Sequence, residues 1–124
     1  MKKLSKNRGA VPSSISETAL LAALIQAEAG TQSYEGQLAV GAVVMNRVRS
    51  GGYPNTVSGV ITQPGQFPPA TNGIVASIAA RGAKASCVKA AQAAINGETN
   101  VGGATHFGRV GKAAGIVIGS HVFY

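Results

Sequence analysis

Apolar side chains early in the chain recur at the spacing of an α-helix. Between residues 14 and 29, Leu21, Leu24 and Ile25 fall at positions i, i+3 and i+4, which share one face of a helix. Glu28 takes position i+7 of the same face, where the pattern calls for another apolar side chain. The spacing therefore predicts a helix over residues 14–29 whose apolar face ends in a carboxylate.

Two interpretations of Glu28 follow from this position. Desolvation disfavours a charged carboxyl group, so burial would raise its pKa and leave it protonated near neutral pH, as a general acid requires. Alternatively, Glu28 lies in the last helical turn, just before Gly30, and its side chain bends out to water. The periodicity alone leaves both interpretations open.

Capping residues predict where the first two helices begin. Ser14 followed by Glu17 fits a capping box for the first helix. Ser33 predicts the cap of a second helix over about residues 34–50. The middle of this helix is apolar, and Gly36 and Gly41 within it would let another backbone come close.

Shorter helical patterns and a loop occupy the middle of the chain. Asn55 is the predicted cap of a short turn over residues 57–61. Residues 63–69 contain Pro and Gly at turn positions and predict a loop, in which Phe67 either stacks on a sugar or covers the core. One or two helical turns are expected over residues 74–81, and a clearer helix begins at Ser86.

From residue 102 onward the helical spacing gives way to a β-prone pattern. Residues 104–107, 115–118 and 121–124 are short β-prone runs separated by glycines, and they predict a small antiparallel sheet after the helices. His106 and His121 lie in these runs. We interpret both as structural histidines held by a hydrogen bond rather than as metal ligands, because no cluster of Cys, Asp or further His accompanies them.

Composition indicates one globular domain with a basic surface. The chain has 124 residues, of which 45% are hydrophobic and 12% are charged, and its formal net charge is +7. We expect a flexible basic segment over residues 1–13 and a single domain over residues 14–124. The excess of positive charge favours an anionic partner: nucleic acid, a membrane surface or a wall polymer. Four of the bases lie in the basic segment, namely Lys2, Lys3, Lys6 and Arg8.

Several classes of protein fit the sequence poorly. Two helices joined by a short turn resemble a helix-turn-helix DNA reader, but the second helix has an apolar middle and no polar row for base edges. No stretch is long enough to span a membrane, and no apolar signal segment follows the basic residues.

The single cysteine, Cys87, is expected to be a small buried hydrophobe. No metal or other cofactor is predicted, because the chain lacks Asp and its Glu residues are dispersed.

The four acidic residues narrow the chemistry. Glu17 fits a cap, Glu35 lies in the first turn of a helix, and Glu98 follows a helix-ending Asn-Gly pair, so Glu28 alone is placed for catalysis. Most glycosidases need two carboxyl groups. Lytic transglycosylases act with one, because the C6 hydroxyl of the sugar attacks the anomeric carbon in place of water.

Five segments together resemble the cell wall hydrolase family of SleB type, which includes spore cortex-lytic enzymes. The resemblance covers about residues 15–124. It is carried by Ala27-Glu28-Ala29, Tyr34 to Val48, Tyr53 to Ile61, Gln66-Phe67, and Ile118 to Tyr124.

The resemblance implies a lysozyme-like α+β fold that is mainly helical, with a small C-terminal antiparallel β-sheet. It also implies cleavage of the β-1,4 bond between N-acetylmuramic acid and N-acetylglucosamine in peptidoglycan, with Glu28 as the catalytic residue. Many relatives carry a second acid where this chain has Gln32, which strengthens the case for a single acid. The predicted product is 1,6-anhydro-N-acetylmuramic acid.

The predicted substrate groove combines residues from the resemblance with polar and aromatic residues near it. We expect a monomer that acts on peptidoglycan strands, without nucleic acid, in the cell wall or the spore cortex or coat. The alternatives are a hydrolytic muramidase with Glu35 as a second acid, and a non-catalytic basic module that binds the wall or DNA. The substrate-binding candidates are Tyr34, Gln66, Phe67, His106, Phe107 and His121.

Overall fold

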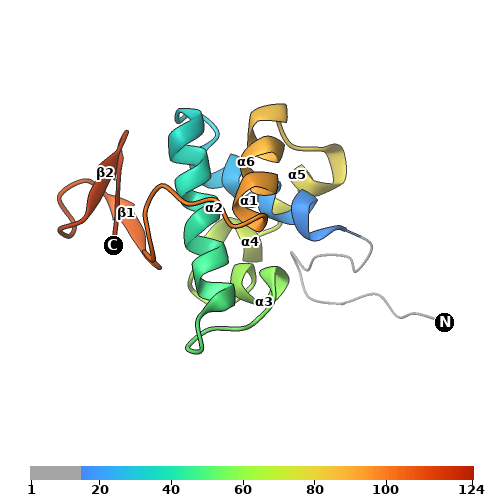
Figure 1. Cartoon of the computed structure of the whole chain (residues 1–124). Helices are drawn as coiled ribbons and strands as arrows, with labels where there is room; N and C mark the ends of the chain where they lie inside the picture. The colour runs from blue at the N-terminus through green and yellow to red at the C-terminus, as the bar shows by residue number, and fades with distance from the viewer. Residues whose placement is uncertain (1–14) are drawn as a thin grey trace.

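The computed structural model describes residues 15–124, so the predicted cap at Ser14 and the basic segment over residues 1–13 lie outside the described residues. Helices precede a small sheet, as predicted, and the fold is α+β (Figure 1). None of the described helices is both long and apolar enough to cross a bilayer. The elements are α1 (Glu17–Ala29), α2 (Tyr34–Arg49), α3 (Val57–Ile61), α4 (Pro68–Thr71), α5 (Ile74–Arg81), α6 (Ala85–Ile95), β1 (Phe107–Arg109), β2 (Ile116–Ile118) and β3 (His121–Phe123).

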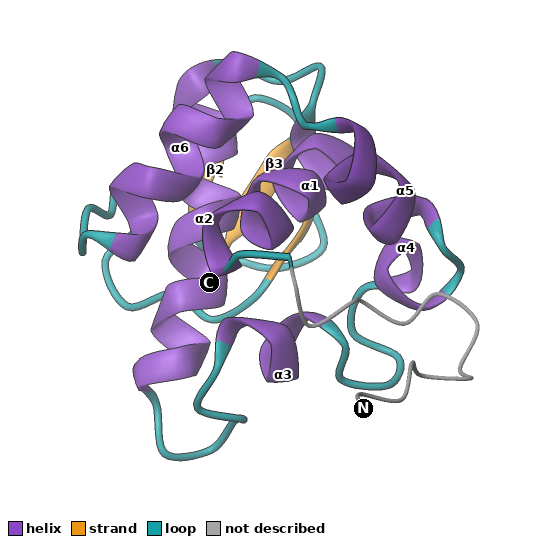
Figure 2. Ribbon diagram, turned by 90° about the vertical axis from the view of Figure 1, so that its right-hand side faces the viewer, coloured by secondary structure: helices purple, strands orange, loops and turns teal. Residues whose placement is uncertain are grey.

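Helix α1 is the centre of the helical body. It packs against α2, α3, α4, α5 and α6, and Figure 2 shows these helices arranged around it. Its side chains from Leu20 to Ile25 are almost fully buried on every side. The apolar positions that predicted one buried face therefore belong to a helix that is enclosed all round up to its last turns.

The predicted start of α1 is wrong. The helix begins at Glu17, and the hydroxyl of Ser16 accepts a hydrogen bond from the backbone N–H of Ala19 at 3.1 Å. Ser16 has the extended backbone that a cap needs, and its hydroxyl satisfies one of the N–H groups that the first turn leaves free. Glu17 is thus the first helical residue, where its charge complements the helix dipole.

Helix α2 matches its prediction closely. The Ser33 hydroxyl accepts from the N–H of Gly36 at 3.3 Å and caps a helix that ends at Arg49. Gly41 faces α6 and α1, because a Cβ atom built there would lie 3.0 Å from Ala94 Cβ and 3.2 Å from Ile25 Cδ1. The absence of a side chain at Gly41 therefore lets α2 and α6 pack closely.

The shorter helices show two departures from the prediction. Thr56, and not Asn55, caps α3, since its hydroxyl accepts from the N–H of Gly59 at 2.9 Å. The end of the predicted loop is also helical, because Pro68 begins α4, and proline is well suited to a first helical turn. Helix α5 forms where it was expected, and α6 begins at Ala85.

The three strands form an antiparallel sheet in the order β1-β3-β2. In the register, Phe107 and Ile116 both lie opposite Phe123, whose side chain is buried in the core. His106 was expected within a strand and lies just before β1, although its backbone exchanges hydrogen bonds with Tyr124. The sheet lies beside α2, at the end of the molecule away from α5 (Figure 1).

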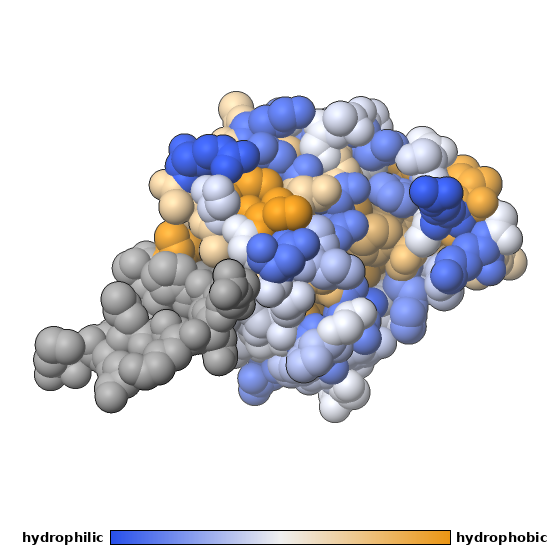
Figure 3. Space-filling view, turned by 180° about the vertical axis from the view of Figure 1, so that it is seen from behind, coloured by the Kyte–Doolittle hydropathy of each residue, from blue (hydrophilic) through white to orange (hydrophobic). Residues whose placement is uncertain are grey.

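The outer side of the sheet remains partly apolar. Val110, Ile116 and Val117 are each about half exposed. In Figure 3 this end of the molecule, at the right of the view, shows strongly hydrophilic and hydrophobic residues side by side. Cys87 is fully buried in α6, as predicted, and burial raises the pKa of its thiol, so it is an unreactive core residue.

Candidate active site

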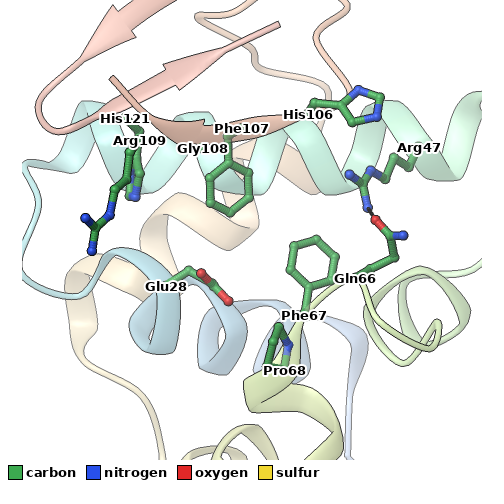
Figure 4. Close-up of a pocket in the computed structure, with 10 residues that line it drawn as sticks. All are labelled: Glu28, Arg47, Gln66, Phe67, Pro68, His106, Phe107, Gly108, Arg109 and His121. Atoms are coloured by element: carbon green, nitrogen blue, oxygen red, sulfur yellow. Dashed lines mark hydrogen bonds between the residues drawn. The ribbon is translucent and has the colours of Figure 1, made fainter. Parts of the chain in front are cut away.

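A cleft of about 330 Å³ opens between the end of α1, the start of α4 and the sheet. Figure 4 shows Glu28 on one side of it, Phe107 from the sheet opposite, and Arg47 with Gln66 at one end. This volume falls within the range of small-ligand sites. The residues that line it are Glu28, Arg47, Gln66, Phe67, Pro68, His106, Phe107, Gly108, Arg109 and His121.

The Glu28 side chain is half-buried and faces the cleft (Figure 4). The helix just before it is rigidly packed, because Leu24 and Ile25 are fully buried. Burial raises the pKa of the Glu28 carboxyl above its usual value, with no contribution from a neighbouring charge. Of the two interpretations of this residue, the structure therefore favours the desolvated carboxyl group over a side chain that simply bends out to water.

Glu28 is the only acid in the cleft. The other three acids of the chain, Glu17, Glu35 and Glu98, all lie among the described residues, are solvent-exposed, and do not line it. The backbone of Glu35 instead accepts a hydrogen bond from Asn100 at 2.9 Å. Chemistry in this cleft therefore has a single carboxyl group available.

Aromatic rings form the wall that faces Glu28. Phe107 stacks on Phe67 with ring centroids 6.3 Å apart and on Phe123 at 5.8 Å. His121 meets Phe107 edge-on at 5.3 Å. Phe67 is only 3% exposed, so it covers the core as well as lining the cleft, whereas Gln66 beside it is exposed.

Arg47 is a cleft residue that the sequence analysis missed. Arginines mostly lie at the surface, but Arg47 is only 4% exposed. Its Nε donates to the carbonyl of Thr105 at 2.7 Å, and its Nη1 donates to Gln66 Oε1 at 3.1 Å. The guanidinium also lies over the rings of Tyr53 at 5.1 Å and Phe67 at 5.3 Å.

These contacts fix the polar end of the cleft. Because Arg47 occupies the amide oxygen of Gln66, the NH₂ group of that amide is left to donate to a ligand. On the same helix, Asn46 donates to the carbonyls of Gly102 at 2.9 Å and Ala104 at 2.8 Å. Helix α2 thereby holds the segment that leads into β1 and places the sheet over Glu28.

The two histidines of the cleft contact aromatic rings and make few hydrogen bonds. Burial lowers the pKa of His121, so its imidazole is neutral near pH 7, and its buried Nδ1 has no hydrogen-bond partner among the described residues. The prediction that a hydrogen bond holds His121 is therefore wrong for Nδ1. His106 is exposed and stacks on Tyr124 at 5.4 Å, with Nδ1 3.1 Å from the Thr105 hydroxyl. Within residues 15–124, no group of three or more potential ligand side chains could hold a metal ion.

Tyr34 and Gln32 lie outside the cleft lining. Tyr34 is partly buried against the core, and Lys89 Nζ lies 5.5 Å from the centre of its ring. The Gln32 Oε1 accepts from the N–H of Ser120 at 3.3 Å. Gln32 thus ties the turn between β2 and β3 to the connection between α1 and α2.

The sequence contained a signal for Arg47 that was not used. Val40, Val43, Val44 and Arg47 have the same i, i+3, i+4, i+7 spacing that singled out Glu28, and the three valines are fully buried. For the remaining cleft residues, Pro68, Gly108 and Arg109, no comparable signal exists. Their positions depend on how the sheet sits over the helices.

The chain is similar to proteins described as cell wall hydrolases and spore cortex-lytic enzymes. A family model described as Cell Wall Hydrolase matches residues 31–124. A spore cortex-lytic enzyme of Bacillus cereus is 38% identical over 108 residues, which cover 85% of this chain and 40% of that protein. The chain therefore spans about two-fifths of the length of this relative. A spore cortex-lytic enzyme of Oceanobacillus iheyensis is 46% identical over 54 residues, covering 44% of this chain and 20% of that protein.

Two solved structures share the fold. The catalytic domain of the germination-specific lytic transglycosylase SleB from Bacillus anthracis superposes with a TM-score of 0.76 at 32% identity, covering 91% of this chain and 98% of the other. The catalytic domain of the Bacillus cereus SleB protein gives a TM-score of 0.75 at 32% identity, covering 96% and 98%.

Proposed function

The chain belongs to the cell wall hydrolase family, and from this membership we propose that it is a peptidoglycan lytic transglycosylase. It cleaves the β-1,4 bond between N-acetylmuramic acid and N-acetylglucosamine in the cell wall or the spore cortex. The name of one relative, a spore cortex-lytic enzyme, and that of one solved structure, a germination-specific lytic transglycosylase, support this proposal.

Glu28 performs both proton transfers in the proposed reaction. In its protonated form it donates to the glycosidic oxygen, and the bond from that oxygen to the anomeric carbon of the muramic residue breaks. The resulting carboxylate then accepts the proton of the muramic C6 hydroxyl, whose oxygen bonds to the same anomeric carbon. The products are a 1,6-anhydro end and a free C4 hydroxyl, and Glu28 regains its proton.

The single acid in the cleft is the observation that carries the proposal. A hydrolytic mechanism with two carboxyl groups needs a second acid within about 10 Å of the first. Every acid other than Glu28 is solvent-exposed and outside the cleft lining. Intramolecular attack by the sugar hydroxyl removes the need for a second group.

The other cleft residues hold the glycan strand. We assign the rings of Phe67 and Phe107 to apolar contact with sugar faces, and the free NH₂ of Gln66 to a substrate oxygen. His106 and His121 lie on the sheet side and complete the groove. Tyr34 lies outside the lining, so any contact that it makes requires a strand longer than the cleft itself.

The substitution Glu28→Gln tests the assignment. The amide keeps the shape of the side chain but carries no transferable proton, so we expect turnover to fall by roughly 10²–10⁴-fold while binding to purified wall material is retained. The matched control is Glu35→Gln, which changes the same functional group at an exposed position outside the cleft. Undiminished turnover in Glu28→Gln, or an equal loss in Glu35→Gln, would contradict the single-acid mechanism.

A further inference from the structure

Two cations meet at the tight turn that ends β1. Arg109 is the last residue of the strand, and the N–H of Lys112 donates to the Arg109 carbonyl at 3.1 Å. Gly111 closes this turn with a φ of 95°, a conformation that favours glycine. We call residues 109–112 the cationic turn.

Arg109 of this turn lies along the cleft wall. Arg109 lines the cleft directly, and in Figure 4 its side chain extends from the sheet at the end of the cleft away from Arg47 and Gln66. The Lys112 side chain packs against Gly108 on the face of β1 opposite the side chains of Phe107 and Arg109, because a Cβ atom built at Gly108 would lie only 3.1 Å from Lys112 Cδ. The absence of a side chain at Gly108 lets the lysine lie against this strand.

No acidic side chain follows residue 98 to balance this turn. Residues 99–124 include Arg109 and Lys112 but no acid. Glu28 is the only acid in the cleft, and its raised pKa favours the neutral form. Opposite Arg109 in the sheet register stands His121, whose lowered pKa keeps it neutral.

The two arginines of the cleft differ in whether the protein already provides partners for their guanidinium groups. Arg47 is buried and already bonded to Thr105 and Gln66. Arg109 and Lys112 are exposed, and within residues 15–124 neither has a carboxylate in ion-pair distance. Their charges are therefore free to meet a ligand.

We propose that the cationic turn binds carboxylate groups of the peptide stems carried by the glycan strand. This inference rests on the proposed function, since it concerns the substrate of the same cleft. The hydroxyl and acetamido groups of the sugars are neutral, so the anionic groups of such a strand belong mainly to its stems. A guanidinium offers a paired donor geometry that matches a carboxylate, and the neighbouring ammonium adds a second charge.

The test compares binding of two forms of one ligand. Soluble peptidoglycan fragments are prepared with free stem carboxylates or with those carboxylates amidated, and dissociation constants are measured in the Glu28→Gln background so that nothing is cleaved. We expect Arg109→Gln to weaken binding of the free form by about three- to tenfold, as partly exposed charges do, and Lys112→Gln, on the other face of the strand, to weaken it less. Binding of the amidated form should stay unchanged by either substitution.

The matched control is Arg81→Gln, which removes one exposed positive charge from α5, outside the cleft lining. An equal loss in Arg81→Gln, or equal losses on the free and amidated fragments, would overturn the proposal and leave only a general charge effect. Because the readout is binding and not cleavage, failure of the transglycosylase mechanism would appear separately, as a wild-type protein that binds fragments and yields no anhydro product.

Discussion

At the scale of single residues, the site has ionisable side chains at two positions where an apolar side chain would stabilise the fold more. Glu28 ends a buried stripe on α1, and Arg47 ends the equivalent stripe on α2. Arg47 is compensated by hydrogen bonds and ring contacts. Glu28 has no such partner among the described residues, so its carboxylate form remains destabilised by desolvation.

Because desolvation destabilises the charged form of Glu28 in the folded protein, we expect the stability of the protein to depend on pH. A carboxyl group whose pKa is raised on folding binds more protons in the folded state, so its stabilising effect is complete below the usual carboxyl pKa and is lost as pH rises through the folded-state pKa. We therefore expect Glu28→Gln to unfold at a higher temperature than the wild type at neutral pH, with the difference vanishing towards acidic pH. Thermal unfolding of both proteins across this range measures it, and a destabilised variant at neutral pH would contradict the expected sign.

Arg47 predicts a second effect at the residue scale. In Arg47→Lys a single ammonium replaces the planar fork, so it cannot bond Thr105 and Gln66 with the same geometry or stack between two rings. We expect the free energy of unfolding to fall by about 1–3 kcal/mol, because buried polar groups lose their partners. Activity should also fall at temperatures where the protein remains folded.

Urea unfolding and steady-state kinetics together measure this change. The matched control is Arg49→Lys, an exposed arginine on the same helix whose only described hydrogen bond goes to the carbonyl of Ile95. Surface changes of this kind usually alter stability by less than about 0.5 kcal/mol. If both substitutions had the same small effect, Arg47 would not be the residue that joins α2 to the cleft.

At the scale of elements, local pattern predicted where the helices lie better than how they begin. Apolar periodicity located α1 and α2, because burial against several neighbours imposes the same spacing on any enclosed helix. The caps of α1 and α3 were missed because adjacent residues compete for each role, as Asn55 and Thr56 do. Only the backbone conformation decides between such neighbours, and it depends on how the helix is packed.

Packing between elements gives a prediction at Gly41. In Gly41→Val the new side chain would meet Ala94 and Ile25, which already lie at contact distance from a single added Cβ atom. We expect a loss of about 1–3 kcal/mol in the free energy of unfolding, as for other overpacked sites. Gly51→Val is the matched control, because Gly51 is exposed and no atom lies within 4 Å of its added Cβ. Equal unfolding midpoints in urea for the two variants would show that α2 and α6 do not depend on this close approach.

At the scale of the whole molecule, the cleft exists because a helical body and a sheet are joined by polar contacts distant in sequence. Asn46 and Arg47 hold residues 102–105, and Gln32 holds the turn at Ser120. The β-prone runs predicted the sheet, but no local pattern reveals which strands pair or where the sheet sits. Glu28 could therefore be singled out from the sequence, whereas the presence of Arg109 in the cleft lining could not.

In the proposed reaction one carboxyl group is enough, because the sugar's own C6 hydroxyl attacks the anomeric carbon in place of water. Digestion of purified peptidoglycan in water enriched in ¹⁸O, followed by mass spectrometry of the released fragments, tests this claim most directly. We predict that the new muramic ends carry no ¹⁸O and are lighter by one water than hydrolysed ends. Reducing ends that contain one ¹⁸O atom from the solvent would contradict it, because they would show that water attacks the anomeric carbon.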